Sequence, residues 1–281
     1  MIANPFTYSA PATLEEVFTM LEDGSGKVLA GGMSLIPLMK LRLASPESLI
    51  DLRRVPNLKD ISEQGGVVRV GAMATHHEVE FSPVIRGKCP LLGETASQIG
   101  DPQVRNMGTI GGSVAHADPA ADYPAALMAL EARIHLRSAQ GERVVAAEEF
   151  FLDAFTTAME PGELVVAVEV AAEDGSEGFK YEKVPHPASG FPVVGVAVRV
   201  KRGSSGIAMA RIAVTGMSSH AFRARNAEAL LEGGKSGAEA AAVVGLDEEA
   251  SSDLYASADY RRHLAQVHAA RAIAAALSRT S

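Results

Sequence analysis

Two short segments carry the residues of this sequence that are best suited to holding a ligand. The first glycine segment is LAGGMS, residues 29–34, and the second glycine segment is TIGGSVAHADPAAD, residues 109–122. In each of them a Gly-Gly pair is followed by a serine. Adjacent glycines let backbone N–H groups point the same way, and they let a ligand approach without a Cβ atom in between. Two such segments that face one another would clamp the pyrophosphate of a dinucleotide.

Glycine pairs also occur in ordinary tight turns, and the residues alone leave this alternative open. The sequence contains neither a G-x-G-x-x-G nor a G-x-x-x-x-G-K-[ST] fingerprint. The first glycine segment precedes a predicted helix, whose free N–H groups favour an anion. The residues are therefore equally consistent with phosphate binding by the backbone, outside the Rossmann and P-loop classes, and with two tight turns.

Polar side chains near the glycine segments add further candidates. Asp118 and Asp122 are four residues apart, so a Mg²⁺ site is conceivable. We prefer the interpretation that Asp122 caps the following helix and accepts hydrogen bonds from ligand hydroxyls. His116 is a candidate either for a hydrogen bond to a phosphate or the ligand, or for a structural role. Arg105 and Lys183 are the cations that could offset a pyrophosphate charge.

Several other chemistries have no support in the sequence. With a single cysteine, Cys89, the chain has no set of ligands for an iron–sulfur cluster or a cysteine-based zinc site. No H-E-x-x-H or G-x-S-x-G motif is present. We therefore expect neither a metal site nor a hydrolytic catalytic residue.

Composition narrows the class of protein. The chain has 281 residues, of which 47% are hydrophobic, and a formal net charge of −8. These values exclude a disordered chain, and the acidic balance argues against nucleic-acid binding. No apolar run approaches the roughly 20 residues of a membrane span. The N-terminal residues show no signal-peptide pattern, so we expect a cytoplasmic protein.

The order of predicted elements gives an α+β protein with two domains. We expect an N-terminal domain over 1–175, with subdomains of about 1–55 and 56–175, and a C-terminal domain over 176–281. A long functional loop is expected over 101–121, because this segment is rich in glycine and proline. The other predicted elements are helices at 13–21, 35–44 with Ser34 as cap, 91–99 and 259–279, strands at 27–30, 48–55, 67–74 and 163–170, a capping box at Thr75 and Glu78, a hairpin around 140–141, and three C-terminal strands.

Three longer strings resemble one family along nearly the whole chain. These are AGGMSLIPLMKLRLASPESLIDLRRV, QVRNMGTIGGSVAHADPAADYPAALMAL and FKYEKVPHPASGFPVVGVAV. They resemble segments of the FAD-binding medium subunits of molybdenum hydroxylases, the group that includes aerobic carbon monoxide dehydrogenase and xanthine dehydrogenases. The resemblance implies a two-subdomain FAD-binding module of the PCMH/VAO-like type, followed by a C-terminal domain with a three-stranded antiparallel sheet and helices.

The resemblance also implies which residues contact the FAD. Asp122 matches a position with polar contacts to FAD, Lys183 one near the isoalloxazine and Phe191 an aromatic beside the flavin ring, while Val165 is a further candidate to line the ring. Met33 and Ser113 depart from the His or Gln and the Asn of many relatives, which leaves their side-chain contacts in doubt. The segments that would wrap the pyrophosphate comprise Leu29, Ala30, Gly31, Gly32, Met33, Ser34, Leu35, Ile36, Thr109, Ile110, Gly111, Gly112 and Ser113.

The function implied by the resemblance is electron transfer within a three-subunit complex. A large molybdopterin subunit and a small subunit with [2Fe–2S] clusters would be the partners, in a dimer of heterotrimers. FAD on this chain would take electrons from the clusters and pass them to an external acceptor. Two alternatives remain: a self-sufficient flavin-dependent oxidoreductase, and a non-catalytic nucleotide-binding or assembly module.

Overall fold

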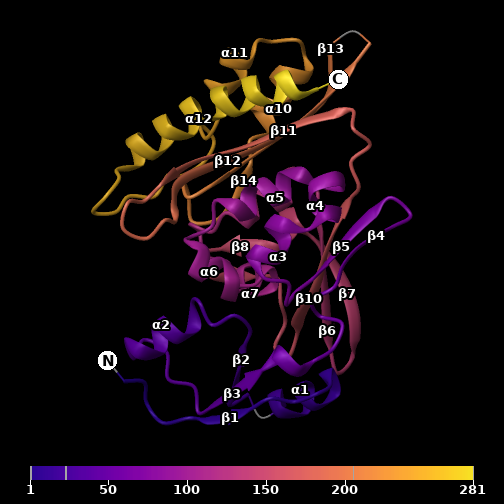
Figure 1. Ribbon diagram of the computed structural model, residues 1–281. Helices are drawn as coiled ribbons and strands as arrows, with labels where there is room; N and C mark the ends of the chain where they lie inside the picture. The colour runs from indigo at the N-terminus through magenta and orange to yellow at the C-terminus, as the bar shows by residue number, and fades with distance from the viewer. Residues whose placement is uncertain (1, 23, 205, 281) are drawn as a thin grey trace.

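The computed structural model describes residues 2–22, 24–204 and 206–280. The chain forms an N-terminal unit, a middle unit and a C-terminal unit, which follow one another from one end of the molecule to the other (Figure 1). None of the described helices combines the length and the apolar character that crossing a membrane requires.

The N-terminal unit is a three-stranded parallel sheet in the order β1-β3-β2. Helix α1 begins at Thr13, whose hydroxyl accepts a hydrogen bond from the backbone N–H of Glu16 at 3.2 Å. The helix expected over 35–44 is shorter, because Arg42 has a left-handed φ of 60°, and Ser34 makes no capping hydrogen bond. The elements are β1 (Thr7–Ser9), α1 (Leu14–Leu21), β2 (Gly26–Leu29), α2 (Leu35–Lys40), β3 (Ser48–Asp51) and the 3-10 helix η1 (Leu52–Arg54).

The middle unit is a five-stranded antiparallel sheet in the order β4-β5-β10-β6-β7, with seven helices beside it. The predicted hairpin joins β6 to β7, and the predicted capping box at Thr75 and Glu78 starts α3. The elements are β4 (Ile61–Gln64), β5 (Val67–Gly71), α3 (His76–Phe81), α4 (Pro83–Lys88), α5 (Pro90–Ser97), α6 (Pro102–Met107), α7 (Ile110–His116), α8 (Tyr123–Ala129), β6 (Arg133–Ser138), β7 (Gly141–Ala146), α9 (Ala147–Phe150), β8 (Phe151–Asp153), β9 (Thr156–Thr157) and β10 (Leu164–Ala171).

The segment 101–121 is mostly helical, so the expectation of a long loop is wrong. The carboxylate of Asp101 caps α6 with a 2.8 Å hydrogen bond, and the hydroxyl of Thr109 caps α7. The residues that suggested a loop lie at helix ends, where they are tolerated: Pro102 is the first residue of α6, and Gly108 separates α6 from α7. Glycine and proline content therefore marked the boundaries of two short helices.

The C-terminal unit is an antiparallel sheet in the order β11-β12-β13-β14. Its three long strands are the ones predicted from the sequence, and the two-residue strand β14 is added at one edge. Helix α12 begins at Ser257, whose hydroxyl accepts a hydrogen bond from the N–H of Tyr260. The elements are β11 (Glu177–Pro185), β12 (Pro192–Gly203), β13 (Gly206–Thr215), β14 (Phe222–Arg223), α10 (Arg225–Glu232), α11 (Gly237–Ala241) and α12 (Ala258–Arg279).

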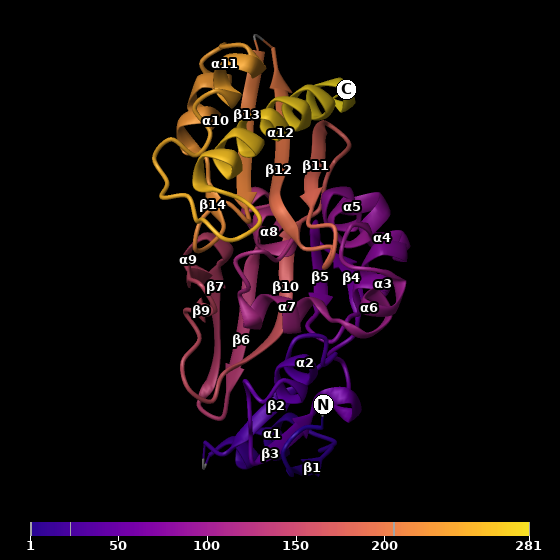
Figure 2. The same cartoon turned by 90° about the vertical axis from the view of Figure 1, so that its left-hand side faces the viewer.

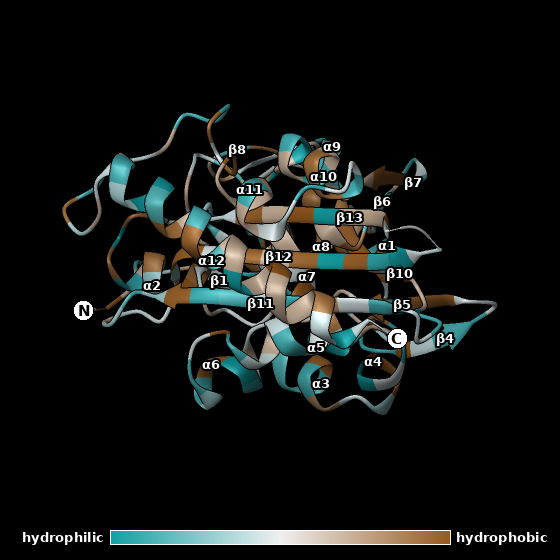
Figure 3. Cartoon of the chain, turned by 90° about the horizontal axis from the view of Figure 1, so that it is seen from above, coloured by the Kyte–Doolittle hydropathy of each residue, from teal (hydrophilic) through white to brown (hydrophobic). Residues whose placement is uncertain are grey.

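Strand β12 separates two apolar cores, because side chains alternate between the two faces of a sheet. Val196 and Val198 pack into the core beneath α10, α11 and α12, whereas Ala197 belongs to the core of the middle unit. Helices α5 and α8 contact the inner face of this sheet, and α12 lies across β11 and β12 on the outer face (Figures 2 and 3). Small side chains on the inner face thus let the C-terminal sheet lie directly on the middle unit.

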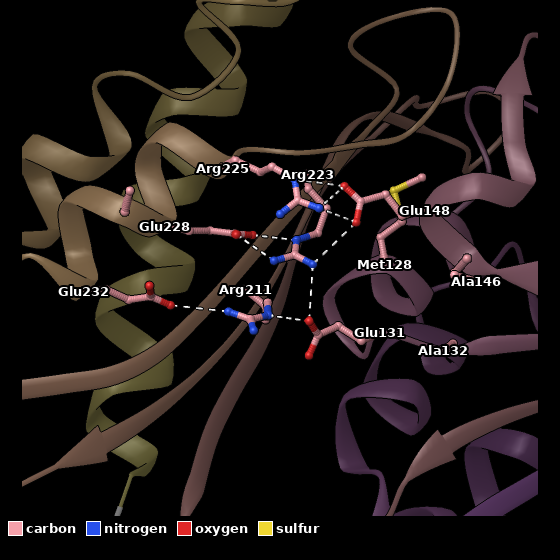
Figure 4. A pocket seen from close by; sticks show the side chains of 12 residues that line it. Met128, Glu131, Ala132, Ala146, Glu148, Arg211, Arg223, Arg225, Glu228 and Glu232 are labelled. Atoms are coloured by element: carbon pink, nitrogen blue, oxygen red, sulfur yellow. Dashed lines mark hydrogen bonds and ion pairs between the residues drawn. The ribbon is translucent and has the colours of Figure 1, made fainter.

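A network of arginine and glutamate side chains joins the same two units at one side of the molecule, around a cleft of about 410 Å³ (Figure 4). Glu131 follows α8 and Glu148 lies on α9, both in the middle unit. Arg211 Nε lies 2.8 Å from Glu131 Oε1, and Arg225 Nη2 lies 2.6 Å from Glu148 Oε1. Arg223 is 3.5 Å from Glu131 and 3.8 Å from Glu148. Opposite charges therefore alternate across the junction.

The buried member of this network is the pair of Arg223 and Glu228. Both side chains are almost fully buried, and two hydrogen bonds of 2.7 and 2.6 Å join them. Glu228 also accepts a 2.8 Å hydrogen bond from the backbone N–H of Ile212 on β13. One carboxylate therefore satisfies a guanidinium and a strand N–H that are both removed from water.

Replacing Glu228 with alanine should lower the free energy of unfolding by about 3 kcal/mol, because a buried guanidinium and a backbone N–H lose their partner. Chemical denaturation measures this loss. Glu149→Ala is the matched control, since Glu149 is an exposed residue of α9 with no hydrogen bond or ion pair to another described residue, and its effect should stay within about 0.5 kcal/mol. Equal effects of the two substitutions would contradict the role given to Glu228.

Candidate functional site

A cleft of about 670 Å³ lies where the three units meet, and we call it the central cleft. Its walls come from β2 and α2 of the N-terminal unit, from α7 and the start of β10 in the middle unit, and from the loop between β11 and β12. The residues expected from the sequence that line it are Leu29, Ala30, Gly31, Gly32, Met33, Ser34, Leu35, Thr109, Gly111, Gly112, Ser113, Asp122, Val165 and Phe191.

Three expected residues do not line the central cleft. Ile110 is fully buried in the core of the middle unit, because it starts α7 and points away from the glycines that follow it. Ile36, on α2, is 37% exposed and faces away from the cleft. Lys183 lies behind the wall, where it binds Asp122.

The two glycine segments lie against each other, as a clamp requires. A methyl group on Gly31 would lie 2.0 Å from the carbonyl oxygen of Met107 and 2.7 Å from the Cα of Gly108. A methyl group on Gly112 would lie 3.5 Å from the Cβ of Ala30. The backbone of the first glycine segment therefore packs directly on the backbone that enters the second one.

A Cβ atom added to these glycines would point into the protein. The sequence had led us to expect that the bare glycines make room for a ligand. A Cβ on Gly111 would meet Ala72 at 2.4 Å, and a Cβ on Gly32 would meet Ile36 at 2.6 Å. Gly32 also has a positive φ of 75°, which disfavours other residues. The glycines are needed for close packing of the two segments and for backbone conformation.

The two Gly-Gly pairs differ in whether their backbone N–H groups have a partner among the described residues. In the second segment, Ile110 donates to Ala74, Gly111 donates to Ala72, and Gly112 donates to the hydroxyl of Thr109. In the first segment, the N–H groups of residues 31–35 make no hydrogen bond with any other residue that the structure describes. These unpaired donors, at the wall of the central cleft, suit an anionic pyrophosphate.

A buried group of three polar side chains forms part of the cleft wall. Asp122 Oδ1 accepts a 2.7 Å hydrogen bond from the hydroxyl of Tyr181, and Lys183 Nζ lies 2.9 and 3.0 Å from the two carboxylate oxygens. Lys183 also donates to the carbonyl of Gln98 at 2.7 Å. Burial raises the pKa of Asp122 to about 6, although Lys183 and Tyr181 act in the opposite direction. Asp122 makes no capping hydrogen bond to α8, so the capping role expected for it is wrong.

The cations of the site differ from those expected. Arg105 does not line the central cleft, because its Nε pairs with Glu80 at 2.9 Å and its Nη1 donates to the carbonyl of Ile99. Lys183 is held by Asp122. Among the described residues that line the cleft, Lys27 on β2 is the one lysine or arginine. Sequence reasoning overlooked Lys27, although its place just before the first glycine segment was a usable signal.

Two candidates from the sequence, His116 and Asp118, line the cleft, and His116 packs against Phe155 with ring centroids 5.1 Å apart. The structure adds His76, which lines the cleft from the first turn of α3 and which no motif indicated. Further lining residues come from other segments and include Ile99, Gly100, Val104, Met159, Ser189 and Gly190.

Replacing Lys183 with methionine should make stability depend more strongly on pH. The folded-state pKa of Asp122, about 6, lies above the ordinary value of 3.8, so its contribution to stability is present below about pH 4 and is lost as pH rises through 6. Without Lys183 the Asp122 carboxylate is buried without a cation. We therefore expect the free energy of unfolding to fall by about 3 kcal/mol at pH 8 and by less at pH 5.

Denaturation at the two pH values tests this expectation. Lys201→Met is the matched control, because Lys201 pairs with Asp174 at the surface and its removal should cost less than about 1 kcal/mol at either pH. A loss for Lys183→Met that is the same at pH 5 and pH 8 would rule out an unpaired Asp122 carboxylate as its cause.

Two family models match the chain. The model described as the FAD binding domain in molybdopterin dehydrogenase matches residues 4–172. The model described as the CO dehydrogenase flavoprotein C-terminal domain matches residues 179–276. Together they account for the units that form the central cleft.

Full-length relatives and solved structures agree with these matches. The carbon monoxide dehydrogenase medium chain of Hydrogenophaga pseudoflava is 38% identical over 99% of both chains, and the nicotine 6-hydroxylase medium subunit of Paenarthrobacter nicotinovorans is 34% identical over 97% of this chain and 98% of its own. A structure of carbon monoxide dehydrogenase from Hydrogenophaga pseudoflava superposes with a TM-score of 0.97 at 39% identity, and quinoline 2-oxidoreductase from Pseudomonas putida 86 with 0.93 at 32%, each over 100% of both chains. The chain therefore belongs to the family of FAD-binding medium subunits of the molybdenum hydroxylases.

Proposed function

We propose that this chain binds FAD in the central cleft and relays electrons from the iron–sulfur clusters of a partner subunit to an external acceptor. The observation that carries the proposal is that residues 31–35 line the cleft while their N–H groups make no hydrogen bond with another residue that the structure describes. Flavin content of the purified protein tests it: the chain should be yellow and release FAD on denaturation. A colourless protein that takes up no FAD would refute the proposal.

The clamp residues divide into donors and packing residues. We propose that residues 29–36 hold the pyrophosphate through backbone N–H groups, with Lys27 nearby to offset the negative charge. Residues 109–113 hold the first glycine segment in place, and the side chain of Ser113 is available to the ligand. The donor set therefore fits an anion that is bound mainly by neutral backbone dipoles.

The flavin end of the cleft is assigned to Asp122, Val165 and Phe191, which line it, and to Lys183. When bound, FAD would supply redox chemistry in which electrons are accepted one at a time and released in pairs. Asp122 contacts the cofactor with a carboxylate that Tyr181 and Lys183 hold in place. Phe191 lines the cleft from the loop between β11 and β12 and is 44% exposed, so its ring is available to the flavin.

The partners proposed are those of the relatives. Several relatives are named medium chains or subunits of larger enzymes. We propose a large molybdopterin subunit and a small [2Fe–2S] subunit, assembled as a dimer of heterotrimers in the cytoplasm. We also propose that the domain boundary lies near residue 175, between the two matched regions. Mass analysis of the co-purified complex and cell fractionation test these points.

The self-sufficient oxidoreductase is the less favoured alternative. The relatives of this chain are named chains or subunits of oxidoreductases, and they match it over nearly their whole length. The second alternative is a nucleotide-binding or assembly module without redox activity. The visible spectrum distinguishes it from the proposed flavoprotein, because bound flavin absorbs visible light.

Replacing Gly31 with alanine should raise the dissociation constant of FAD by at least about tenfold. The new methyl group overlaps the carbonyl of Met107, and the resulting strain of about 1–3 kcal/mol separates the two glycine segments. Flavin fluorescence titration of the apo-protein measures the change. Gly87→Ala is the matched control, since a methyl group there meets no atom within 4 Å, and it should bind FAD as the unaltered protein does.

The isolated chain should reduce an artificial acceptor when its flavin is chemically reduced, yet should oxidise no organic substrate. The physical reason is the division of labour: no described group of three or more His, Cys, Asp or Glu residues can hold a metal, and substrate oxidation is assigned to the molybdenum subunit. Steady-state assays with and without the partner chains measure this. Substrate turnover by the isolated chain would favour the self-sufficient oxidoreductase.

A further inference from the structure

His76 is a buried titratable side chain to which the proposed function gives no role. It is the first residue of α3, it is 5% exposed, and it lines the central cleft. Its Nδ1 lies 3.2 Å from the hydroxyl oxygen of Tyr123, and the two rings are tilted with centroids 5.3 Å apart. One nitrogen of the imidazole is therefore engaged within the protein.

The other nitrogen, Nε2, lies against the backbone between the two glycine segments. A methyl group on Gly108 would come within 2.6 Å of His76 Nε2, so the imidazole fills the space that a side chain at residue 108 would need. The backbone N–H of His76 donates to the carbonyl of Gly108 at 2.9 Å, which fixes the ring beside this turn. Nε2 itself has no hydrogen-bond partner among the residues that the structure describes.

The environment of Tyr123 decides which nitrogen of His76 carries the proton. Tyr123 is fully buried, and among the described residues His76 Nδ1 is the one hydrogen-bond partner of its hydroxyl. If Nδ1 carried the proton, the hydroxyl of Tyr123 would be a buried donor without an acceptor, which costs about 1–3 kcal/mol. The hydroxyl therefore donates to Nδ1, and the proton of the imidazole resides on Nε2.

The imidazole is also kept neutral. Burial and the nearby guanidinium of Arg105 lower the pKa of His76 to about 4. At neutral pH the side chain thus presents a single uncharged N–H donor. A donor of this kind suits a carbonyl oxygen or a ring nitrogen that accepts a hydrogen bond.

The neighbours of His76 indicate which part of FAD it meets. A Cβ atom on Gly108 would approach the carbonyl oxygen of Val104, and a Cβ atom on Gly100 would approach the side chain of Val104. Gly190, next to Phe191, packs on Gly100 with a distance of 3.6 Å from its Cβ position to the Cα of Gly100. His76 Nε2 therefore lies at Gly108, whose Cα is 2.7 Å from the Cβ position of Gly31 in the first glycine segment. The loop that carries Phe191 is reached from Gly108 only through Val104 and Gly100, so the part of FAD nearest to His76 is the part held by the first glycine segment.

We propose that His76 binds FAD by donating a hydrogen bond from Nε2 to an acceptor oxygen of the cofactor beside the first glycine segment. The inference rests on the proposed function, since it requires FAD in the central cleft. Tyr123 is a positioning residue in this arrangement, because it acts on the cofactor only by fixing the tautomer of His76.

Two substitutions of His76 separate this binding role from a purely structural one. In His76→Gln the side-chain amide reaches near the place of Nε2, so a donor to the cleft is kept while the contact with Tyr123 is lost. In His76→Asn the amide lies near the place of Nδ1, so the contact with Tyr123 is kept while the donor to the cleft is lost. The binding role and the structural role therefore predict opposite rankings.

The experiment is a titration of the apo-form of the full chain with FAD, followed by flavin fluorescence. We expect His76→Asn to raise the dissociation constant about tenfold, as the loss of one hydrogen bond would. We expect His76→Gln to stay within about threefold of the unaltered protein. The reverse ranking, or equal values for the two variants, would overturn the proposal.

Tyr123→Phe gives an independent measurement should either His76 variant fail to fold. It removes the hydroxyl that fixes the tautomer while leaving Nε2 in place, so we expect a two- to fivefold rise in the dissociation constant. No change in affinity would overturn the tautomer argument. If the unaltered chain binds no FAD, the proposed function fails; if it binds FAD and the variants rank otherwise, only the role of His76 fails.

Discussion

The contact on which the rest of the site depends is the close packing of backbone on backbone between Gly31 and the Met107–Gly108 peptide. No side chain fits between them, since even a methyl group would overlap the Met107 carbonyl. This contact joins a small parallel sheet to the helices of the middle unit, and it turns the N–H groups of residues 31–35 toward the central cleft. The clamp is therefore built from main-chain geometry, and the side chains around it mainly keep that geometry in place.

Local signals in the sequence predicted local structure well. The capping box of Thr75 and Glu78, the hairpin before Gly141 and the three long C-terminal strands each follow from interactions between residues that are close in the chain. The segment 101–121 was misjudged for a related reason. Its glycines and prolines stop helices, and composition does not tell whether the stretch between two stops is itself a helix.

The composition of the central cleft was predictable only in part. Repeated glycine pairs and a family resemblance located most of its wall, but the direction of each missing side chain depends on contacts between distant segments, such as Gly111 with Ala72. Lys27 and His76 were missed because neither belongs to a motif. They reach the cleft through the pairing of β2 and the start of α3, which are features of the tertiary structure.

The bond network around Asp122 has a consequence for the biogenesis of the protein. Its partners Tyr181 and Lys183 follow it by 59 and 61 residues and belong to the C-terminal sheet. Ser189, Gly190 and Phe191, which complete the wall of the central cleft, belong to the same C-terminal unit. The complete cleft, with Asp122 paired beside it, therefore exists only once the last third of the polypeptide has been synthesised and has docked.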